Sequence, residues 1–381
     1  MPAGVPMVRL PVINPPSSAS APAATPLFET GPKSISAVRV LRISVTDRCN
    51  FRCVYCMPED GVVWLPKDNI LTFEEIADIA RAAVDIHGIR RFKLTGGEPT
   101  VRHGIVDLVR ILRRIKGVED LSLTTNGMLL EDLAAPLKES GLDRATVSID
   151  SLRPDRFRRI TRTGDLAAVM RGLDRAEDVG LLPLKINCVT MRGTNDDEAA
   201  DFARLTLRRS VTVRFIEYMP LGDAAVQHSD ARVSDDELGP AGGCGAQDRG
   251  KNVFIPESEV RETIEREVSP LVPVDRSTEA GAGPAVVYRL ALPGVAGRIG
   301  FISAMSAPFC ATCNRLRLTA EGVLRSCLFE GGEVPVRDLL RRTPDPAARR
   351  SAVASAMTEC VRLKPDVHSN HGNQQMSRIG G

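Results

Sequence analysis

The 381-residue sequence predicts an α/β protein built around a parallel β-sheet. Six short runs of strand-like residues alternate with segments of helical periodicity, and repeated strand–helix units imply a parallel sheet covered by helices. Right-handed crossovers then leave either a doubly wound sheet or a barrel. Six strands are fewer than the eight of a closed barrel, so a partial, open-sided barrel fits, although periodicity alone does not separate it from a flat sheet.

The six strands are expected at residues 42–46, 91–95, 121–125, 145–149, 184–189 and 212–217. The clearest helix begins after Thr72, because Thr72 and Glu75 have the spacing of a capping box. Further helical patterns cover residues 104–115, 129–140 and 166–180. After Met219 the alternation ends, and a Gly- and Ala-rich stretch at 222–252 is expected to be a long loop. A short helix from Pro256 and a strand near 286–291 follow.

The composition excludes several classes of protein. A net charge of +2 argues against a broad nucleic-acid surface, which needs an excess of positive charge. No apolar run approaches the roughly 20 residues of a membrane helix. The first 36 residues are rich in Pro, Ala and Ser, and we expect a disordered tail there. Nine cysteines, an odd number, suggest metal binding in a reducing compartment, and hence a cytoplasmic protein.

A first group of three cysteines follows the first strand, where active sites of parallel α/β folds are built. Cys49, Cys53 and Cys56 have the spacing C-x-x-x-C-x-x-C. A 4Fe–4S cluster normally takes four thiolates, one per iron, so three cysteines leave one iron open to a small molecule. On the spacing alone, a zinc site or a redox-inert site is the alternative.

Polar residues gather at the ends of the other strands. They are TGGEP (95–99), TTNG (124–127), SID (148–150) and EYMP (217–220), with Lys185 and Asn187 inside the fifth strand. The two glycines of TGGEP allow backbone to approach a ligand closely, with Glu98 as a charged partner. Turn formation explains Asn-Gly alone, but not so many polar strand ends on one rim.

Cys310, Cys313 and Cys327 form a second group, with Arg315 and Arg317 between them. Alternate residues of an extended segment share a face, and arginine forks suit phosphate oxygens. The group therefore favours a second open cluster beside a phosphorylated, nitrogen-containing ligand. A zinc site with a distant fourth ligand, and a solvated charged edge for the two arginines, are the alternatives. Cys188, Cys244 and Cys360 lie outside both groups and receive no role, and His368 and His371 are not expected to bind metal.

The first cysteine group and the downstream GGEP resemble the radical S-adenosylmethionine (SAM) superfamily. In that superfamily the open iron holds SAM, and an electron from the cluster cleaves SAM to a 5′-deoxyadenosyl radical. Over residues 38–381 the chain also resembles the GTP 3′,8-cyclase family, the first enzymes of molybdenum cofactor biosynthesis. The motifs that carry this resemblance are LRISVTDRCNFRCVYCMP, LTGGEP, TTNG, EYMPLG, CATCNRLRLT and the terminal MSRIGG.

The resemblance implies a partial (β/α)6 barrel with a C-terminal cluster-binding domain closing its open side. The expected divisions are a tail at 1–36, the barrel at 37–222, and the C-terminal domain with the Gly-Gly tail at 223–381. It implies two 4Fe–4S clusters, held by Cys49, Cys53, Cys56, Cys310, Cys313 and Cys327. It assigns SAM to Tyr55, Gly97, Ser148 and Met219, and GTP to Arg42, Lys93, Thr124, Lys185, Arg315, Leu316 and Arg317.

The implied reaction is a radical cyclisation of GTP to (8S)-3′,8-cyclo-7,8-dihydroguanosine 5′-triphosphate. The deoxyadenosyl radical takes hydrogen from the ribose 3′ carbon, the carbon radical attacks guanine carbon 8, and the second cluster binds the guanine ring. Arg42, Arg315 and Arg317 are the catalytic candidates, Arg42 for the later uptake of an electron and a proton. The glycines Gly380 and Gly381 match a tail that reaches the active site in the family.

The implied partners are GTP and a downstream cyclic pyranopterin monophosphate synthase. The electron donor is not indicated, and a homodimer is compatible with the sequence. Two other functions stay open on the residues alone. One is a different radical SAM enzyme, acting on a peptide or another nucleotide. The other is a zinc-stabilised, non-enzymatic binding module.

Overall fold

The computed structural model describes residues 31–58, 61–221, 253–275, 281, 283–329, 331–368 and 376–379. Several predicted features lie outside these residues. They are residues 1–30 of the N-terminal tail, the loop at 222–252 with Cys244, His371, and the terminal Gly380 and Gly381.

All six expected strands are present, close to their predicted boundaries. They are β1 (Val40–Ser44), β2 (Arg91–Thr95), β3 (Asp120–Thr125), β4 (Arg144–Ser148), β5 (Leu184–Thr190) and β6 (Val211–Glu217). The C-terminal part of the chain adds β7 (Leu271–Pro273), β8 (Val286–Leu290), β9 (Arg298–Ile302), β10 (Arg315–Leu318), β11 (Val323–Arg325) and β12 (Glu333–Pro335).

The expected helices are confirmed, and others accompany them. The α-helices are α1 (Phe73–His87), α2 (Ile105–Arg113), α3 (Leu130–Glu139), α4 (Pro154–Thr161), α5 (Leu166–Asp178), α6 (Ala199–Arg208), α9 (Glu257–Glu267), α10 (Arg337–Arg342), α11 (Pro346–Arg362) and α12 (Met376–Ile379). The short 3₁₀ turns are η1 (Ile35–Ala37), η2 (Lys67–Asn69), η3 (Pro99–Val101), η4 (Asp196–Glu198) and η6 (Cys310–Thr312). Helix α1 begins with the predicted capping box, in which Thr72 and Glu75 each bond the other's backbone N–H.

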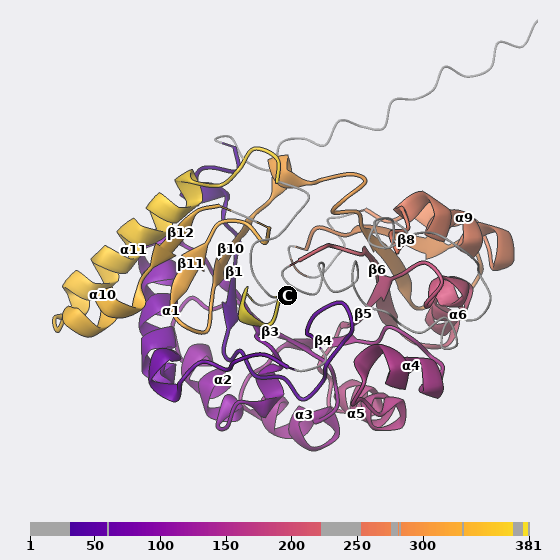
Figure 1. Cartoon of the computed structure of the whole chain (residues 1–381), viewed down its shortest axis with the longest axis horizontal. Coiled ribbons are helices and arrows are strands. Elements are labelled where there is room, and N and C mark those ends of the chain that lie inside the picture. The colour runs from indigo at the N-terminus through magenta and orange to yellow at the C-terminus, as the bar shows by residue number, and fades with distance from the viewer. Residues whose placement is uncertain are drawn as a thin grey trace, which may run out of the picture.

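The twelve strands form one open sheet in the order β12-β11-β10-β1-β2-β3-β4-β5-β6-β9-β8-β7. Strands β1 to β6 are parallel neighbours in chain order, which confirms the partial barrel. The C-terminal strands extend this sheet at both edges, because β10 pairs in parallel with β1 and β9 with β6. Figure 1 shows the curved sheet with the helices α1 to α6 along its outer side. It draws α12 as a yellow turn inside the curve, where Ile379 is buried.

Side chains alternate between the two faces of these strands. Leu41, Phe92 and Leu121 are register partners on the outer face and are buried in the core beneath the helices. The intervening residues face the inside of the curve and are mostly polar. Residues paired across neighbouring strands share a face, so the row Arg317, Arg42, Lys93 and Ser122 runs continuously across the inner surface. The outer face of the sheet, beneath the helices, is therefore apolar, and its inner face is polar and rich in cations.

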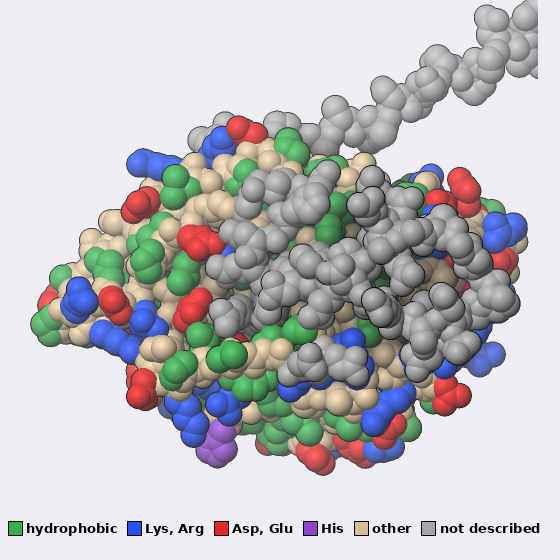
Figure 2. Space-filling model, in the orientation of Figure 1, with side chains coloured by type: hydrophobic (Ala, Val, Ile, Leu, Met, Phe, Trp, Pro, Cys, Tyr) green, Lys and Arg blue, Asp and Glu red, His purple; other side chains and the backbone are tan. Residues whose placement is uncertain are grey.

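The outer surface of the molecule is mixed in charge. On the face shown in Figure 2, the described Lys and Arg side chains are interspersed with Asp and Glu, in line with the small net charge. None of the helices in the described parts of the chain has the length and apolar character of a membrane span.

Candidate active site

The first cysteine group lies in the loop that leaves the carboxyl end of β1. The backbone N–H groups of Arg52 and Val54 donate to the carbonyls of Thr161 and Ile160, each at 3.0 Å, which docks the loop on the end of α4. The amide Nδ2 of Asn126, from TTNG, donates to Asn50 Oδ1 at 2.8 Å and lies 4.0 Å from Cys49 Sγ. The end of helix α4 and the end of strand β3 therefore hold this loop in place.

The glycines of TGGEP have a structural role in addition to the predicted one. A Cβ at Gly97 would lie 2.3 Å from the Arg48 carbonyl oxygen, and one at Gly96 would lie 2.6 Å from that of Thr46. The backbone that approaches these glycines is therefore the start of the cysteine loop itself. Gly97 and Glu98 donate their N–H groups to the carbonyls of Thr46 and Arg48, each at 2.7 Å. The missing side chains allow two strand ends to lie against each other.

The predicted role of Glu98 as a charged partner for a ligand is wrong. Glu98 is buried, and one oxygen accepts from the hydroxyls of Thr100 and Thr125, at 2.5 and 2.7 Å. The other oxygen accepts from the Asn126 N–H at 2.6 Å. Burial raises the pKa of this carboxyl. Glu98 therefore ties the end of β2 to the end of β3 and has no free oxygen aimed at the barrel.

The four residues matched to SAM lie at the carboxyl ends of strands. Gly97 follows β2, Ser148 is the last residue of β4, and Met219 lies just beyond β6. Tyr55 is in the cysteine loop, and its hydroxyl donates to Asp150 Oδ2 at 2.7 Å. The rim predicted from the sequence therefore brings these four positions to one end of the sheet, around the first cysteine group.

The inner face holds a layer of cations from five strands. Arg42 from β1, Lys93 from β2, Lys185 from β5, Arg214 from β6 and Arg317 from β10 make up this cationic layer. Burial lowers the pKa of Lys93, and Arg214, Arg42 and Lys185 lower it further. Burial likewise lowers the pKa of Arg317 to about 9, with Arg315 adding to the effect. Mutual repulsion of this kind is what a polyanion would relieve.

Arg214 was not identified from the sequence, although its charge acts on both Lys93 and Arg42. The sequence offered one signal for Arg214: it is a basic residue among the apolar residues of the strand TVRFIE. By contrast, Arg144 lies on the same face but forms an ion pair with Asp120. The charge of Arg144 is thus partly compensated by Asp120, although it still lowers the pKa of Lys93.

Several buried polar atoms on the inner face have no hydrogen-bond partner among the described residues. Thr124 Oγ1 and Asn187 Oδ1 are two of them. A buried hydroxyl or amide without a partner is costly, so both atoms are suited to a polar ligand inside the curve. Thr124 was matched to GTP, and Asn187 is the register partner of Arg214.

Leu316 does not share this face. Its side chain is fully buried in the outer core, beside its register partner Leu41. The alternation of the strand places Arg315 and Arg317 inward and Leu316 outward. Leu316 was matched to GTP only as part of the Arg315–Arg317 segment, and its side chain does not face the interior.

The second cysteine group flanks β10 and β11. Cys310 and Cys313 precede β10, and Cys327 follows β11. The guanidinium of Arg315 lies 3.8 Å from Cys313 Sγ and stacks over the Phe309 ring at 5.0 Å. Buried Lys364 donates to the carbonyls of Cys313 and Arg315, at 3.1 and 3.2 Å. Lys364 was not identified from the sequence, because only the fold brings residue 364 beside this loop.

The two cysteine groups have different electrostatic surroundings. Burial raises the pKa of Cys49 to about 11, and Glu98 adds to the effect. Burial alone would also raise the pKa of Cys313, but Arg315 and Lys364 bring it to about 7. Cationic neighbours favour the thiolate, which is the form that ligates metal. Burial therefore disfavours the thiolate at Cys49, and also at Cys310 of the second group, whereas Arg315 and Lys364 favour it at Cys313.

The groups lie at opposite ends of the same inner face. The first follows the carboxyl end of β1, whereas the second precedes the amino end of β10, which is parallel to β1. The paired part of β1 is five residues long, Val40–Ser44, so the ladder separates the two ends by about 13 Å at ~3.3 Å per residue. The cationic layer, and not a hydrophobic core, lies on the face between them. One polar face of the sheet therefore has a cysteine group at each end.

The donor set fits two iron–sulfur clusters. All six cysteines of the two groups are free thiols. In the part of the chain that the structure describes, no three His, Cys, Asp or Glu side chains are grouped as ligands of a single metal ion. A cluster binds one thiolate per iron and does not need that compact arrangement. Bound clusters would be held by Cys49, Cys53 and Cys56 at one end, and by Cys310, Cys313 and Cys327 at the other.

Comparison with known proteins agrees with this geometry. Residues 43–206 match the family model described as the radical SAM superfamily, and residues 237–370 match that described as Molybdenum Cofactor Synthesis C. The structure of Streptococcus suis SuiB bound to S-adenosylmethionine is similar with a TM-score of 0.50 and 15% identity, and the match covers 82% of this chain and 68% of that one. At this identity the likeness concerns the fold alone.

Curated relatives cover nearly the whole chain. A GTP 3′,8-cyclase of Pelotomaculum thermopropionicum is 44% identical over 90% of this chain and 98% of its own length. That of Moorella thermoacetica is also 44% identical, with the same coverage. That of Thermodesulfovibrio yellowstonii is 41% identical over 90% of this chain and 97% of its own length. The resemblance predicted from the motifs is thus confirmed, and the chain belongs to the GTP 3′,8-cyclase family of the radical SAM superfamily.

Proposed function

We propose that this protein converts GTP to (8S)-3′,8-cyclo-7,8-dihydroguanosine 5′-triphosphate, the first step of molybdenum cofactor biosynthesis. The observation that supports this most strongly is the cationic layer between the two cysteine groups. Lys93, Lys185, Arg214 and Arg317 converge there with Arg42, and they depress one another's proton affinity. A triphosphate is the kind of ligand that neutralises such a layer.

The other polar groups of the interior suit the rest of the nucleotide. Thr124 Oγ1 and Asn187 Oδ1 are without partners among the described residues, and they are able to bond ribose hydroxyls or a base. Arg315 lies beside Cys313 at the opposite end from the SAM residues. We therefore place the guanine towards the second cysteine group and the ribose towards the first.

When bound, the first cluster and SAM supply the 5′-deoxyadenosyl radical that removes the ribose 3′ hydrogen, and the second cluster binds guanine. The protein holds the ribose and base so that carbon 3′ and carbon 8 of one nucleotide meet. Holding two reacting groups of one ligand in the right orientation removes a large part of the free-energy barrier to their reaction. The parallel strands do this rigidly, because every cation of the layer stands on a strand.

We assign Arg42 to the later stage of the reaction. It lies in the middle of the layer, between the register partners Arg317 and Lys93. Burial lowers the pKa of Arg42, and Arg317, Arg315 and Arg214 lower it further. A guanidinium in these surroundings stabilises negative charge that develops nearby. Arg42 is therefore suited to assist the uptake of an electron and a proton by the cyclised nucleotide.

The substrate is tested by anaerobic incubation of the iron-loaded protein with SAM, dithionite and each nucleoside triphosphate in turn. We expect GTP to be consumed and 5′-deoxyadenosine to accumulate with it. ATP, CTP and UTP should remain intact. Consumption of ATP or of a peptide, with GTP untouched, would reject the cyclase and favour a different radical SAM enzyme.

The product needs a following enzyme, and we propose a cyclic pyranopterin monophosphate synthase as that partner. The cytoplasm is the proposed location, because reduced thiols are maintained there, and the eight described cysteines are all free. A homodimer is compatible with the proposal and is not required by it.

A further inference from the structure

Asp150 is a buried carboxylate at the first cysteine group to which the family resemblance gives no role. It ends the SID sequence after β4 and is 3% exposed. Its Oδ2 accepts from the Tyr55 hydroxyl at 2.7 Å, and its Oδ1 accepts from the Val189 N–H at 2.8 Å. Tyr55 lies between Cys53 and Cys56. One carboxylate thus joins the cysteine loop to the ends of two strands, β4 and β5.

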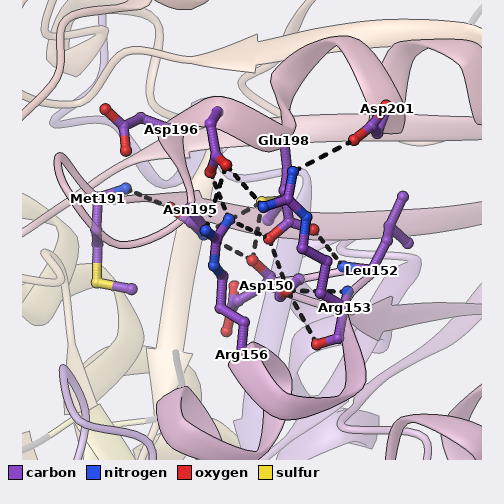
Figure 3. A network of polar contacts seen from close by, with 12 residues as sticks. Asp150, Leu152, Arg153, Arg156, Met191, Asn195, Asp196, Glu198 and Asp201 are labelled. Atoms are coloured by element: carbon purple, nitrogen blue, oxygen red, sulfur yellow. Dashed lines mark hydrogen bonds and ion pairs between the residues drawn. The ribbon is translucent and has the colours of Figure 1, made fainter. Parts of the chain in front are cut away.

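Asn195 holds the backbone on which this carboxylate stands. Its Nδ2 donates to the carbonyls of Asp150 and Val189, at 2.6 and 2.8 Å, and its Oδ1 accepts from the Met191 N–H at 2.8 Å. Asn195 is 1% exposed. Figure 3 shows it in the centre of the network, between Met191 and Asp150. The Asp150 side chain is therefore aimed at Tyr55 from a backbone that is itself anchored.

Glu198 extends this network to α4. It is fully buried and accepts from Ser151 Oγ, the Leu152 N–H and Arg156 Nη1, each at 2.7 Å. Figure 3 shows Arg156 reaching it from α4. The far end of α4 receives the N–H bonds of Arg52 and Val54 from the cysteine loop. The same network therefore supports both the tyrosine and the helix on which the loop rests.

We propose that Asp150 is a positioning residue for the first cysteine group, which fixes the Cys53–Cys56 segment through the Tyr55 hydroxyl so that the loop is ordered before SAM binds. The inference rests on the proposed function for the identity of the ligand. The bond from the Tyr55 hydroxyl to Asp150 Oδ2, at 2.7 Å, joins residues that are 95 positions apart in the chain. Phenylalanine at 55 would keep the ring and remove only this bond.

The test compares Tyr55→Phe, Asp150→Asn and the double variant with wild type. In the protein without iron, hydrogen–deuterium exchange of the peptide covering residues 49–58 should be faster in all three variants, by a similar factor. In the iron-loaded protein, SAM should bind about tenfold more weakly in each, the size expected for one hydrogen bond to a buried carboxylate. The double variant should be no worse than either single one, because both substitutions act on the same bond: Phe removes the hydroxyl donor, and Asn replaces the carboxylate acceptor with a neutral amide.

Tyr288→Phe is the matched control, because Tyr288 lies on β8 and packs on Phe301, away from the loop. It should leave both measurements unchanged. Unchanged exchange and SAM affinity in Tyr55→Phe would overturn the inference, and so would additive losses in the double variant. If Asp150→Asn does not fold, Tyr55→Phe alone decides. Failure of wild type to bind SAM or consume GTP would instead refute the proposed function, so the two failures are distinguishable.

Discussion

Cys49→Ala is expected to abolish SAM cleavage and to halve the iron content of the protein. Each thiolate of an open cluster binds its own iron, so two remaining cysteines cannot hold the four-iron unit. The second group lies at the other end of the sheet and should keep its iron. Anaerobically purified wild type should therefore contain about eight irons per chain and the variant about four, from four irons per cluster. Iron analysis and 5′-deoxyadenosine release measure the two effects.

Cys244→Ala is the matched control for this variant. Cys244 is a cysteine that belongs to neither group in the sequence. Its replacement should leave about eight irons per chain and SAM cleavage intact, since two clusters of four irons remain. Full iron and normal cleavage in Cys49→Ala would contradict the assignment of the first group. Zinc without visible absorbance in wild type would refute every radical mechanism and indicate a zinc-stabilised module.

Arg317→Ala is expected to weaken GTP binding while SAM cleavage without GTP remains measurable. Arg317 is 3% exposed and stands on β10, beside Arg42 and near Cys313. Loss of one charge-assisted hydrogen bond should weaken binding by about 10- to 100-fold. The first cysteine group is at the opposite end of the strand ladder, so its chemistry should persist. Equilibrium binding of GTP and 5′-deoxyadenosine release without GTP separate the two effects.

Arg110→Ala supplies the control, because Arg110 is a half-exposed arginine of α2 that pairs with Asp107. It should bind GTP as wild type does. Equal loss of SAM cleavage in Cys49→Ala and Arg317→Ala would contradict the division of roles between the two ends. Unchanged GTP affinity in Arg317→Ala would remove that residue from the proposed triphosphate site.

The sequence predicts the barrel well because its signals are local. Strands β1 to β6 and helix α1 follow from periodicity and a capping box, and both depend on residues close together in the chain. Helix α4 was missed, since it is rich in arginine and buries only Phe157, Ile160 and Thr161. The pairing of β10 with β1 joins residues more than 270 positions apart. No local pattern reports such a pairing.

The candidate site likewise contains residues that the local sequence indicates and residues that only the folded chain brings together. The spacing of the cysteines, and of Arg315 and Arg317 between them, indicates the site from the sequence, whereas the resemblance to the family supplies Arg42 and Lys93. The errors concern residues whose partners are distant in the sequence. Glu98 looked available for a ligand, but its partners Thr125 and Asn126 come from the next strand end. The roles of Arg214, Lys364 and Asp150 likewise depend on contacts that only the folded chain creates.

The most direct test of the account uses GTP labelled with deuterium at the ribose 3′ carbon. If the nucleotide lies on the cationic layer with its ribose towards the SAM residues, the deuterium should appear in 5′-deoxyadenosine. Mass spectrometry of the 5′-deoxyadenosine formed with labelled and unlabelled GTP measures the transfer. Deuterium-free 5′-deoxyadenosine, with the label retained in the nucleotide, would contradict the placement of GTP between the two cysteine groups.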